Sequence, residues 1–305
     1  MWLFQQRSLG IHQKVILVNT YVTSRLWFMA SVLSIPNSSV AKITSRIGNF
    51  IWARYPCRIP IEQLALPVSK GGLNLHLPSQ KCKALLLNRF LRCLEYTPFA
   101  SSFLDQFQNP PNVSGIPALY PCLKLIAREL PYLPENITRN PSSPAVLDTF
   151  RNTMQTPKVV AENPNVQWSR IWRNVRSRAL ASAEKSTYYL IVNGKIPHAA
   201  LFYRQNRVDT PMCIHCTTVE EDLEHKFSTC VRVRHLWSYL RPKLEAVLNR
   251  RVNYKMLSFP ELKNTDSISR NKALKMFIVY VNFVLDVKSS FTVEALDFVL
   301  SCCCP

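Results

Sequence analysis

The chain has 305 residues, of which 47% are hydrophobic, and its formal net charge is +19. This length and apolar content allow two modest domains and exclude wholesale disorder. The excess of positive charge predicts a polyanionic partner, with nucleic acid before an anionic membrane surface, although an ordinary basic protein stays a simpler reading. Every apolar stretch is short or interrupted, so we expect a soluble intracellular protein without a signal peptide, a transmembrane helix or a membrane partner.

The first hundred residues predict three amphipathic helices. Apolar side chains recur at helical spacing from Val15 to Met29, from Val40 to Phe50 and from Leu87 to Leu94. Between the second and third helices, residues 56–78 hold four prolines and a Gly-Gly pair, which favour turns and short extended pieces. These hundred residues carry twelve Lys or Arg against two Glu, a formal charge of +10. We assign residues 1–104 to one basic helical segment.

From residue 105 to residue 166 the helical pattern dissolves. Ten of the 21 prolines of the chain lie between Pro110 and Pro164, among many Asn and Ser. Such a composition is typical of a linker. We therefore predict a Pro-rich linker, mobile or loosely packed, over residues 105–166.

The helical pattern resumes at Trp168. Trp168, Ile171, Trp172 and Val175 share one face while arginines occupy other angles, which predicts a basic amphipathic helix. Two further helical stretches, 188–205 and 231–248, bracket a cluster of Cys and His. We assign 167–248 to a small helical domain around this cluster and 249–305 to a tail with helices near 272–287 and 293–300. The expected fold class is mainly α.

The cluster pairs a Cys-x-x-Cys with a His-x4-Cys, namely Cys213, Cys216, His225 and Cys230. In a reducing compartment ten cysteines are not expected to form a disulfide framework, and zinc takes four such ligands at tetrahedral corners. Four protein ligands leave no open position for water, so we predict one structural zinc ion. Chance clustering is one alternative. His215 in place of His225 is another, although it would strain the Cys-x-x-Cys turn.

Other chemistry finds little support in the sequence. A zinc deaminase needs an upstream His-x-Glu, whereas the sequence has His198-Ala-Ala. The six glycines form no phosphate-binding loop, and no nucleophile elbow is present. The acidic run 220–224 is interpreted as a solvated loop or as a partner of His225. We expect no catalysis and no small-molecule substrate. Four scattered cysteines are expected to be structural or incidental: Cys57, Cys82, Cys93 and Cys122.

Basic residues alternate with aromatic ones on both sides of the cluster. Trp168, Trp172 and Trp237 are expected in the core, because a small zinc module needs large apolar anchors. The contacts to nucleic acid are therefore assigned to arginines, which hold phosphates. The assigned residues are Arg170, Arg173, Arg176, Arg178, Arg204, Arg207, Arg232 and Arg234.

Two stretches, together about two thirds of the chain, resemble the C-terminal part of a non-LTR (LINE-type) retrotransposon reverse transcriptase. The first is similar to the thumb and runs through Arg7-Ser-Leu-Gly-Ile-His-Gln-Lys14, Asn19, Ile35-Pro36, Phe50-Ile-Trp52, Glu62-x-Leu64 and Lys70-Gly-Gly-Leu73. The second resembles the C-terminal zinc-binding domain and runs through Trp168, Trp172, Gly194-Lys-Ile-Pro197, Arg204, Cys213-x-x-Cys216, Glu221-x-x-x-His225-x-Phe227-x-x-Cys230 and Trp237. Lys226 departs from the family, which usually has an aliphatic residue there.

The resemblance implies a thumb that packs against a primer–template duplex. RNA or an RNA–DNA hybrid is then the expected partner, chromosomal target DNA is a possible further one, and the location is nuclear with a cytoplasmic pool. The polymerase motif, a Tyr-x-Asp-Asp-like turn, is missing, and the seven aspartates are isolated from one another, so two-metal nucleotidyl transfer has no ligands. We expect a non-catalytic truncated copy, a degenerate fragment or a partial gene model. The rival expectations are a structural or protein-interaction zinc module without nucleic-acid binding, and a fragment without function.

Overall fold

The computed structural model describes residues 9–53, 55–56, 58–95, 125–126, 128–286 and 291–304. Within these ranges the chain is mainly helical, which confirms the predicted fold class. The β-structure of the described residues is one isolated antiparallel bridge between Met212 and Glu220. No helix within these ranges has both the length and the apolar content needed to cross a membrane.

The predicted helices of the first segment (residues 9–95) are present, but the first one is interrupted. The elements are α2 (Ile11–Leu17), the π-helical turn η1 (Val18–Val22), α3 (Ser24–Ala30), α4 (Asn37–Trp52), α5 (Ile61–Ala65), the 3-10 turn η2 (Val68–Lys70) and α6 (Pro78–Glu95). The wider π turn shifts the helical register, so the apolar face expected from Val15 to Met29 is not continuous. Val15 and Val18 are buried, whereas Met29 is 52% exposed.

The described part of the Pro-rich segment is folded, and the expectation of loose packing is wrong for it. Its elements are η3 (Leu130–Tyr132), α9 (Glu135–Arg139), α10 (Ser143–Asn152) and α11 (Lys158–Glu162). Helices α9 and α11 follow directly on Pro134 and Pro157, and α10 has a proline in its first turn. Proline is tolerated at helix starts because the first N–H groups have no partner inside the helix. Val146 and Leu147 of α10 are buried with Leu87 of α6.

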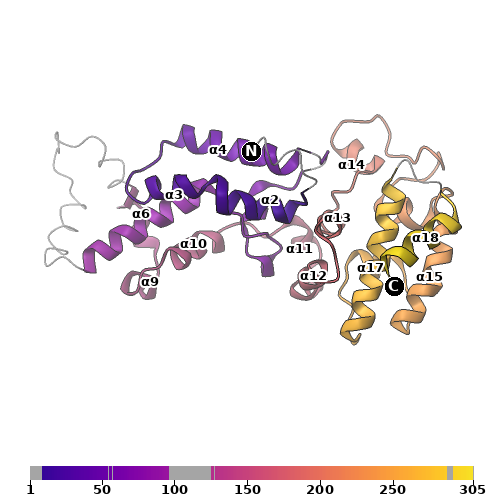
Figure 1. Cartoon of the computed structure of the whole chain (residues 1–305). Helices are drawn as coiled ribbons and strands as arrows, with labels where there is room; N and C mark the ends of the chain where they lie inside the picture. Colours follow the sequence, from indigo (N-terminus) through magenta and orange to yellow (C-terminus); the bar gives the residue numbers. More distant parts are fainter. Residues whose placement is uncertain are drawn as a thin grey trace.

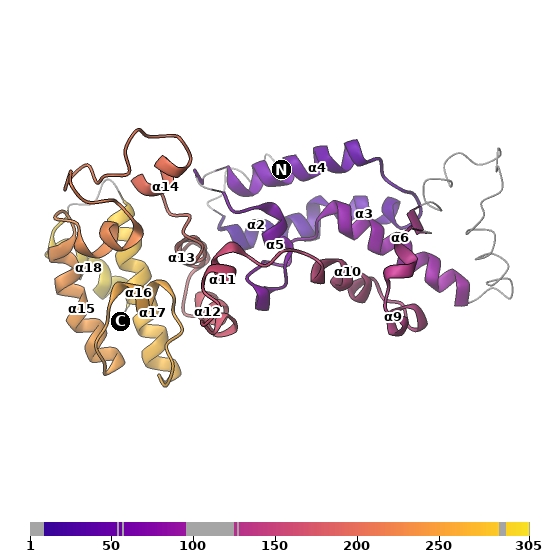
Figure 2. The ribbon, with the colours of Figure 1, turned by 180° about the vertical axis from the view of Figure 1, so that it is seen from behind.

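The second half of the chain holds the remaining helices. They are α12 (Trp168–Val175), α13 (Ser182–Val192), α14 (Ala199–Arg204), the π turn η4 (His225–Thr229), α15 (Arg234–Leu248), α16 (Tyr254–Ser258), α17 (Ser267–Leu285) and α18 (Val293–Cys303). The helix expected over 188–205 is in fact two helices, because Gly194 takes a left-handed φ of 61° and Pro197 follows it. In Figures 1 and 2 the chain is elongated, with α6 and α9 toward one end and α15, α17 and α18 at the other.

One hydrophobic core joins the first segment to the second half of the chain. Ile11 from α2, Trp172 from α12, Tyr188 from α13, Leu240 from α15 and Phe277 from α17 are all buried in it. Helix α17 packs against α13 and α15, and α18 packs against α15 and α17. The tail is therefore part of the core that also supports the Cys/His cluster.

We call the place where the first segment meets α12 and α13 the docking contact. The Ile11 N–H donates to Ser186 Oγ at 2.8 Å, and Tyr189 Oη donates to the carbonyl of Gly71 at 2.7 Å. Gly71 has a φ of 86°, and a Cβ there would lie 2.6 Å from the Trp172 ring. Residues of both stretches that carry the family resemblance thus touch each other here.

Candidate metal centre

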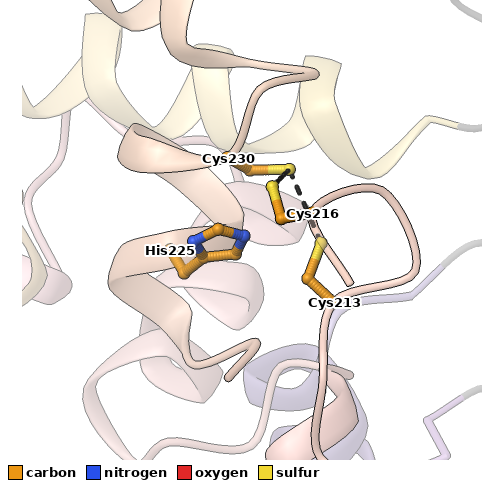
Figure 3. A group of neighbouring side chains, drawn as sticks. All are labelled: Cys213, Cys216, His225 and Cys230. Carbon is orange, nitrogen blue, oxygen red and sulfur yellow. Dashed lines mark hydrogen bonds between the residues drawn. The ribbon is translucent and has the colours of Figure 1, made fainter. Parts of the chain in front are cut away.

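The metal knuckle (residues 212–230) begins with a short hairpin that carries two cysteines. The Met212–Glu220 bridge closes the hairpin, and the Cys213 N–H donates to the carbonyl of Val219 at 2.8 Å. The turn is tight because Thr217 takes a φ of 56° while its N–H donates to the carbonyl of Cys213 at 2.8 Å. Both thiols therefore face the same side of one turn (Figure 3).

The π turn η4 and the residue that follows it supply the other two side chains. Five positions separate His225 from Cys230, and on an α-helix such side chains would point about 140° apart. In the wider π turn the Cys230 N–H donates to the carbonyl of His225 at 2.9 Å, so the two residues come onto one side. The Asp222 carboxylate accepts the His225 N–H at 2.7 Å and holds the start of this turn.

The four side chains fit a tetrahedral metal ion. One ligand atom from each of Cys213, Cys216, His225 and Cys230 lies within 4.8 Å of all the others. The Sγ atom of Cys230 is 3.7 Å from that of Cys213 and 3.8 Å from that of Cys216. Sulfur atoms about 2.3 Å from a tetrahedral ion would be about 3.8 Å apart. The buried Nε2 of His225 has no hydrogen-bond partner within the described part of the chain, as expected for a ligand atom.

The protonation of the cysteines follows from their surroundings. Burial raises the pKa of the Cys230 thiol to about 12. The N–H of Val231 donates to Cys216 Sγ at 3.5 Å, and this hydrogen bond lowers the pKa of Cys216. A bound cation would replace the thiol protons, since thiolates are the metal ligands. The arrangement is compatible with one metal ion.

The alternative ligand and the acidic run lie outside the group of four. His215 is exposed, with Nε2 3.3 Å from Arg232 Nη1. Glu221 receives hydrogen bonds from the Ala199 N–H and from Lys226 Nζ, at 3.2 and 3.1 Å. The family departure at Lys226 is therefore accommodated by an ion pair. His225 is the histidine that faces the thiols (Figure 3).

The two halves of the knuckle are attached to the body differently. Phe227 of η4 is fully buried and stacks on Tyr254, with ring centroids 6.0 Å apart. Tyr280 of α17 donates its hydroxyl to the carbonyl of Phe227 at 2.6 Å. On the hairpin, by contrast, Ile214 is 82% exposed. The core therefore holds η4, whereas the hairpin has few apolar contacts of its own.

The eight arginines assigned to nucleic acid fall into three groups. Arg170, Arg173, Arg176 and Arg178 lie on or just after α12, Arg204 and Arg207 at the end of α14, and Arg232 and Arg234 just after η4. Helices α12 and α14 lie toward opposite edges of the molecule, with α13 between them (Figures 1 and 2). Because α12 and α14 lie toward opposite edges, the arginines do not form one strip.

The three tryptophans Trp168, Trp172 and Trp237 are buried, which confirms their predicted place in the core.

The sequence analysis did not assign Arg58 or Lys195 to a binding surface. Lys195 lines two adjoining depressions between the first segment and the second half of the chain, and Arg58 lines the shallower of them. The sequence offers no signal for this pairing, because the two residues are far apart in the chain and neither belongs to a cluster of charge. Only the fold brings them together.

Some sequence predictions fall partly outside the described residues. Cys82 is buried, and burial raises the pKa of its thiol to about 11, as expected of a structural cysteine. Arg7 and the side chains of Cys57, Cys93 and Cys122 lie outside the described part.

Comparisons of the sequence with protein-family models and with curated proteins find no match.

Proposed function

We propose that this chain is the non-catalytic C-terminal part of a non-LTR retrotransposon reverse transcriptase that binds RNA or an RNA–DNA hybrid. The observation that carries the proposal is the Cys/His cluster, because it combines the ligand order of the family with four ligand atoms that lie within 4.8 Å of one another. The resemblance of two stretches in the family's order supports it further. The proposal contains no catalytic step, since the sequence lacks the paired aspartates of a polymerase.

We infer that the metal is zinc and that its role is structural. Three thiolates and one imidazole are a ligand set that zinc favours, and four protein ligands leave no position for a reacting water. The ion would hold the hairpin against η4. The residues that would bind it are Cys213, Cys216, His225 and Cys230.

Charge supports nucleic acid as the partner. The chain has 38 Lys and Arg against 19 Asp and Glu, so even if every carboxylate paired with one cation, half of the cations would have no carboxylate partner. A surface of this kind binds phosphates with little sequence preference and releases counterions as it does so. Affinity should therefore fall steeply with salt.

The test uses the full-length, metal-loaded chain with a labelled 20-nucleotide RNA and with an RNA–DNA hybrid of the same length. Neutralising six or more phosphates predicts an affinity loss of about 10³-fold between 50 and 200 mM salt. Two unrelated sequences should bind about equally. No binding at 50 mM salt, or a strong sequence preference that persists at 200 mM, would contradict the proposal.

A second candidate is a protein-interaction module without nucleic-acid binding, and a separate observation favours it. Ile16, Tyr21 and Phe28 of the first segment are 63%, 70% and 77% exposed. These three side chains come from the consecutive elements α2, η1 and α3, and exposed apolar side chains that gather on one face suit a protein partner. In the same titration this candidate predicts that the zinc-loaded chain does not bind RNA.

A further inference from the structure

An open groove lies between parts of the first segment and of the second half of the chain, beside the core that joins them. Its volume is about 1320 Å³, and its lining comes from α5, the α10–α11 region, the end of α13, α14, the residues just before η4, and α16. A shallower depression of about 470 Å³ beside α4 shares Pro60 and Lys195 with it. The two depressions therefore adjoin, and Lys195 belongs to both.

Cations line the two adjoining depressions at intervals. Arg58 lines the shallow part, Lys195 lies at the junction and Arg204 lines the large groove. None of the three forms an ion pair within the described ranges. Arg58 Nη1 is 3.4 Å from Asn49 Oδ1, and Arg204 Nε donates to the carbonyl of Ala200 at 3.2 Å. Each guanidinium thus keeps further donors for a phosphate.

Away from Lys195 and Arg204, the large groove suits phosphate less well. Its lining there has the carboxylates of Glu62, Glu162, Asp222 and Glu224 against the cations Lys158 and Lys255, and Lys158 already pairs with Glu162 at 3.5 Å. These carboxylates would repel a sugar-phosphate backbone. Leu201, Leu223 and Phe259 contribute apolar surface. Carboxylates can accept hydrogen bonds from the amino groups of bases, and apolar and aromatic side chains can pack against base faces. This lining therefore suits unpaired bases.

We propose that the groove binds a single strand of nucleic acid, with its phosphates along Arg58, Lys195 and Arg204 and its bases in the large groove. The inference rests on the proposed function and narrows it to one site and one form of ligand. A duplex keeps its bases stacked inside and offers this groove only its backbone. The chain therefore prefers single strands to duplexes of the same length.

The first test is a double charge reversal, Arg58→Glu with Lys195→Glu, in the full-length, metal-loaded chain. Both side chains reach the surface, so metal content and melting temperature should not change. Affinity for a labelled 12-nucleotide single-stranded RNA should fall about tenfold or more, with a shallower salt dependence, because phosphate contacts are lost. The control, Arg89→Glu with Lys272→Glu, makes the same change of charge at exposed sites on α6 and α17. It should change the affinity by less than about threefold.

The second test changes the ligand. A 12-nucleotide single-stranded DNA with several abasic sites keeps its phosphates but lacks those bases, and the wild-type chain should bind it about tenfold more weakly than the intact strand. Equal affinity would overturn the placement of bases in the groove. Equal losses in the groove and control variants would overturn the site but leave the proposed function standing. If the wild-type chain binds no nucleic acid, the proposed function itself fails.

Discussion

The metal centre joins side chains within an 18-residue segment, whereas the docking contact joins residues that are more than 100 positions apart in the chain. The two regions are stabilised by different forces. Around the thiols the buried cluster of the described residues is small: it consists of Cys213, Cys230 and Val233, with the partly buried Cys216, Val284 and Phe291 packed against it. The docking contact lies inside the main core, beside residues such as Ile11 and Tyr189. A small cluster cannot offset the entropy of ordering a loop, whereas a large core can. The hairpin of the knuckle should therefore depend on a bound ion, and the docking contact on its packing.

Loss of the metal should produce the largest effect, and it should be local. Cys216→Ser removes a ligand, so the metal content of the purified chain should fall from about one ion to nearly none. Amide protons of residues 212–220 should then exchange rapidly, because little else holds the hairpin. Those of α13 should stay protected. Hydrogen exchange followed by mass spectrometry measures both regions in one experiment.

The matched control for this prediction is Cys302→Ser, which changes an exposed cysteine of α18 outside the cluster. It should leave both the metal content and the exchange pattern unchanged. If Cys216→Ser kept a full complement of metal, the ligand assignment would be wrong. If α13 lost protection together with the hairpin, the contrast between the two regions would be wrong.

The sequence was informative about the metal centre because ligand spacing is a local property. The order of Cys213, Cys216, His225 and Cys230 predicts a four-ligand group, and the fold brings these side chains together. The π turn was not predictable from it, since a His-x4-Cys spacing does not specify the backbone conformation between the two ligands. The grouping of the arginines was not predictable either. It depends on how α12, α13 and α14 pack, and helical periodicity carries no information about that.

The docking contact should be most sensitive at Gly71. Gly71→Ala places a methyl group 2.6 Å from the Trp172 ring at a φ of 86°. Strain and the displaced ring together should lower the free energy of unfolding by about 2–4 kcal/mol. Gly194→Ala is the control, because its φ is also positive at 61° but nothing lies within 4 Å. It should cost about 1 kcal/mol, and equal losses in urea denaturation would show that Trp172 does not matter.

The fold was predicted well where local sequence patterns decide the structure and poorly where long-range packing does. Helices with a clear apolar stripe, such as α4, α12 and α15, were expected close to where they occur. The Pro-rich segment was misjudged because proline at a helix start and proline in a linker look alike in composition. The docking contact involves Gly71 and Tyr189, which no local pattern connects. Long-range packing of this kind must be observed.

A smaller loss is expected from Ser186→Ala. Ser186 Oγ accepts the buried N–H of Ile11, and an alanine would leave that donor without a partner. The expected cost is about 1–2 kcal/mol of unfolding free energy. Thr187→Ala, on the same helix, removes only a hydroxyl that donates to the carbonyl of Ala183 at 3.3 Å. It should change the stability by less than about 0.5 kcal/mol, so similar losses in the two variants would count against the docking contact.

The smallest effect should be a change in pH dependence at His12, which lies against Tyr189 with ring centroids 5.9 Å apart. Burial, and then the charges of Arg176 and Lys185, lower the pKa of His12 from 6.5 to about 4. Between these values the unfolded chain binds a proton that the folded chain does not, so this group makes the fold less stable as the pH falls from 6.5 toward 4. Above pH 6.5 it has no such effect.

His12→Leu removes this proton linkage while filling a similar volume. Its stability at pH 8 fixes the packing difference between the two side chains, since His12 is neutral in both states there. Between pH 8 and 5.5 the variant should lose about 1 kcal/mol less than the wild type. Release of metal in acid should affect both chains equally, because His12 is not one of the four ligands. Parallel curves of unfolding free energy against pH would mean that His12 is solvated in the folded chain, and that the docking contact is looser around this ring than its burial implies.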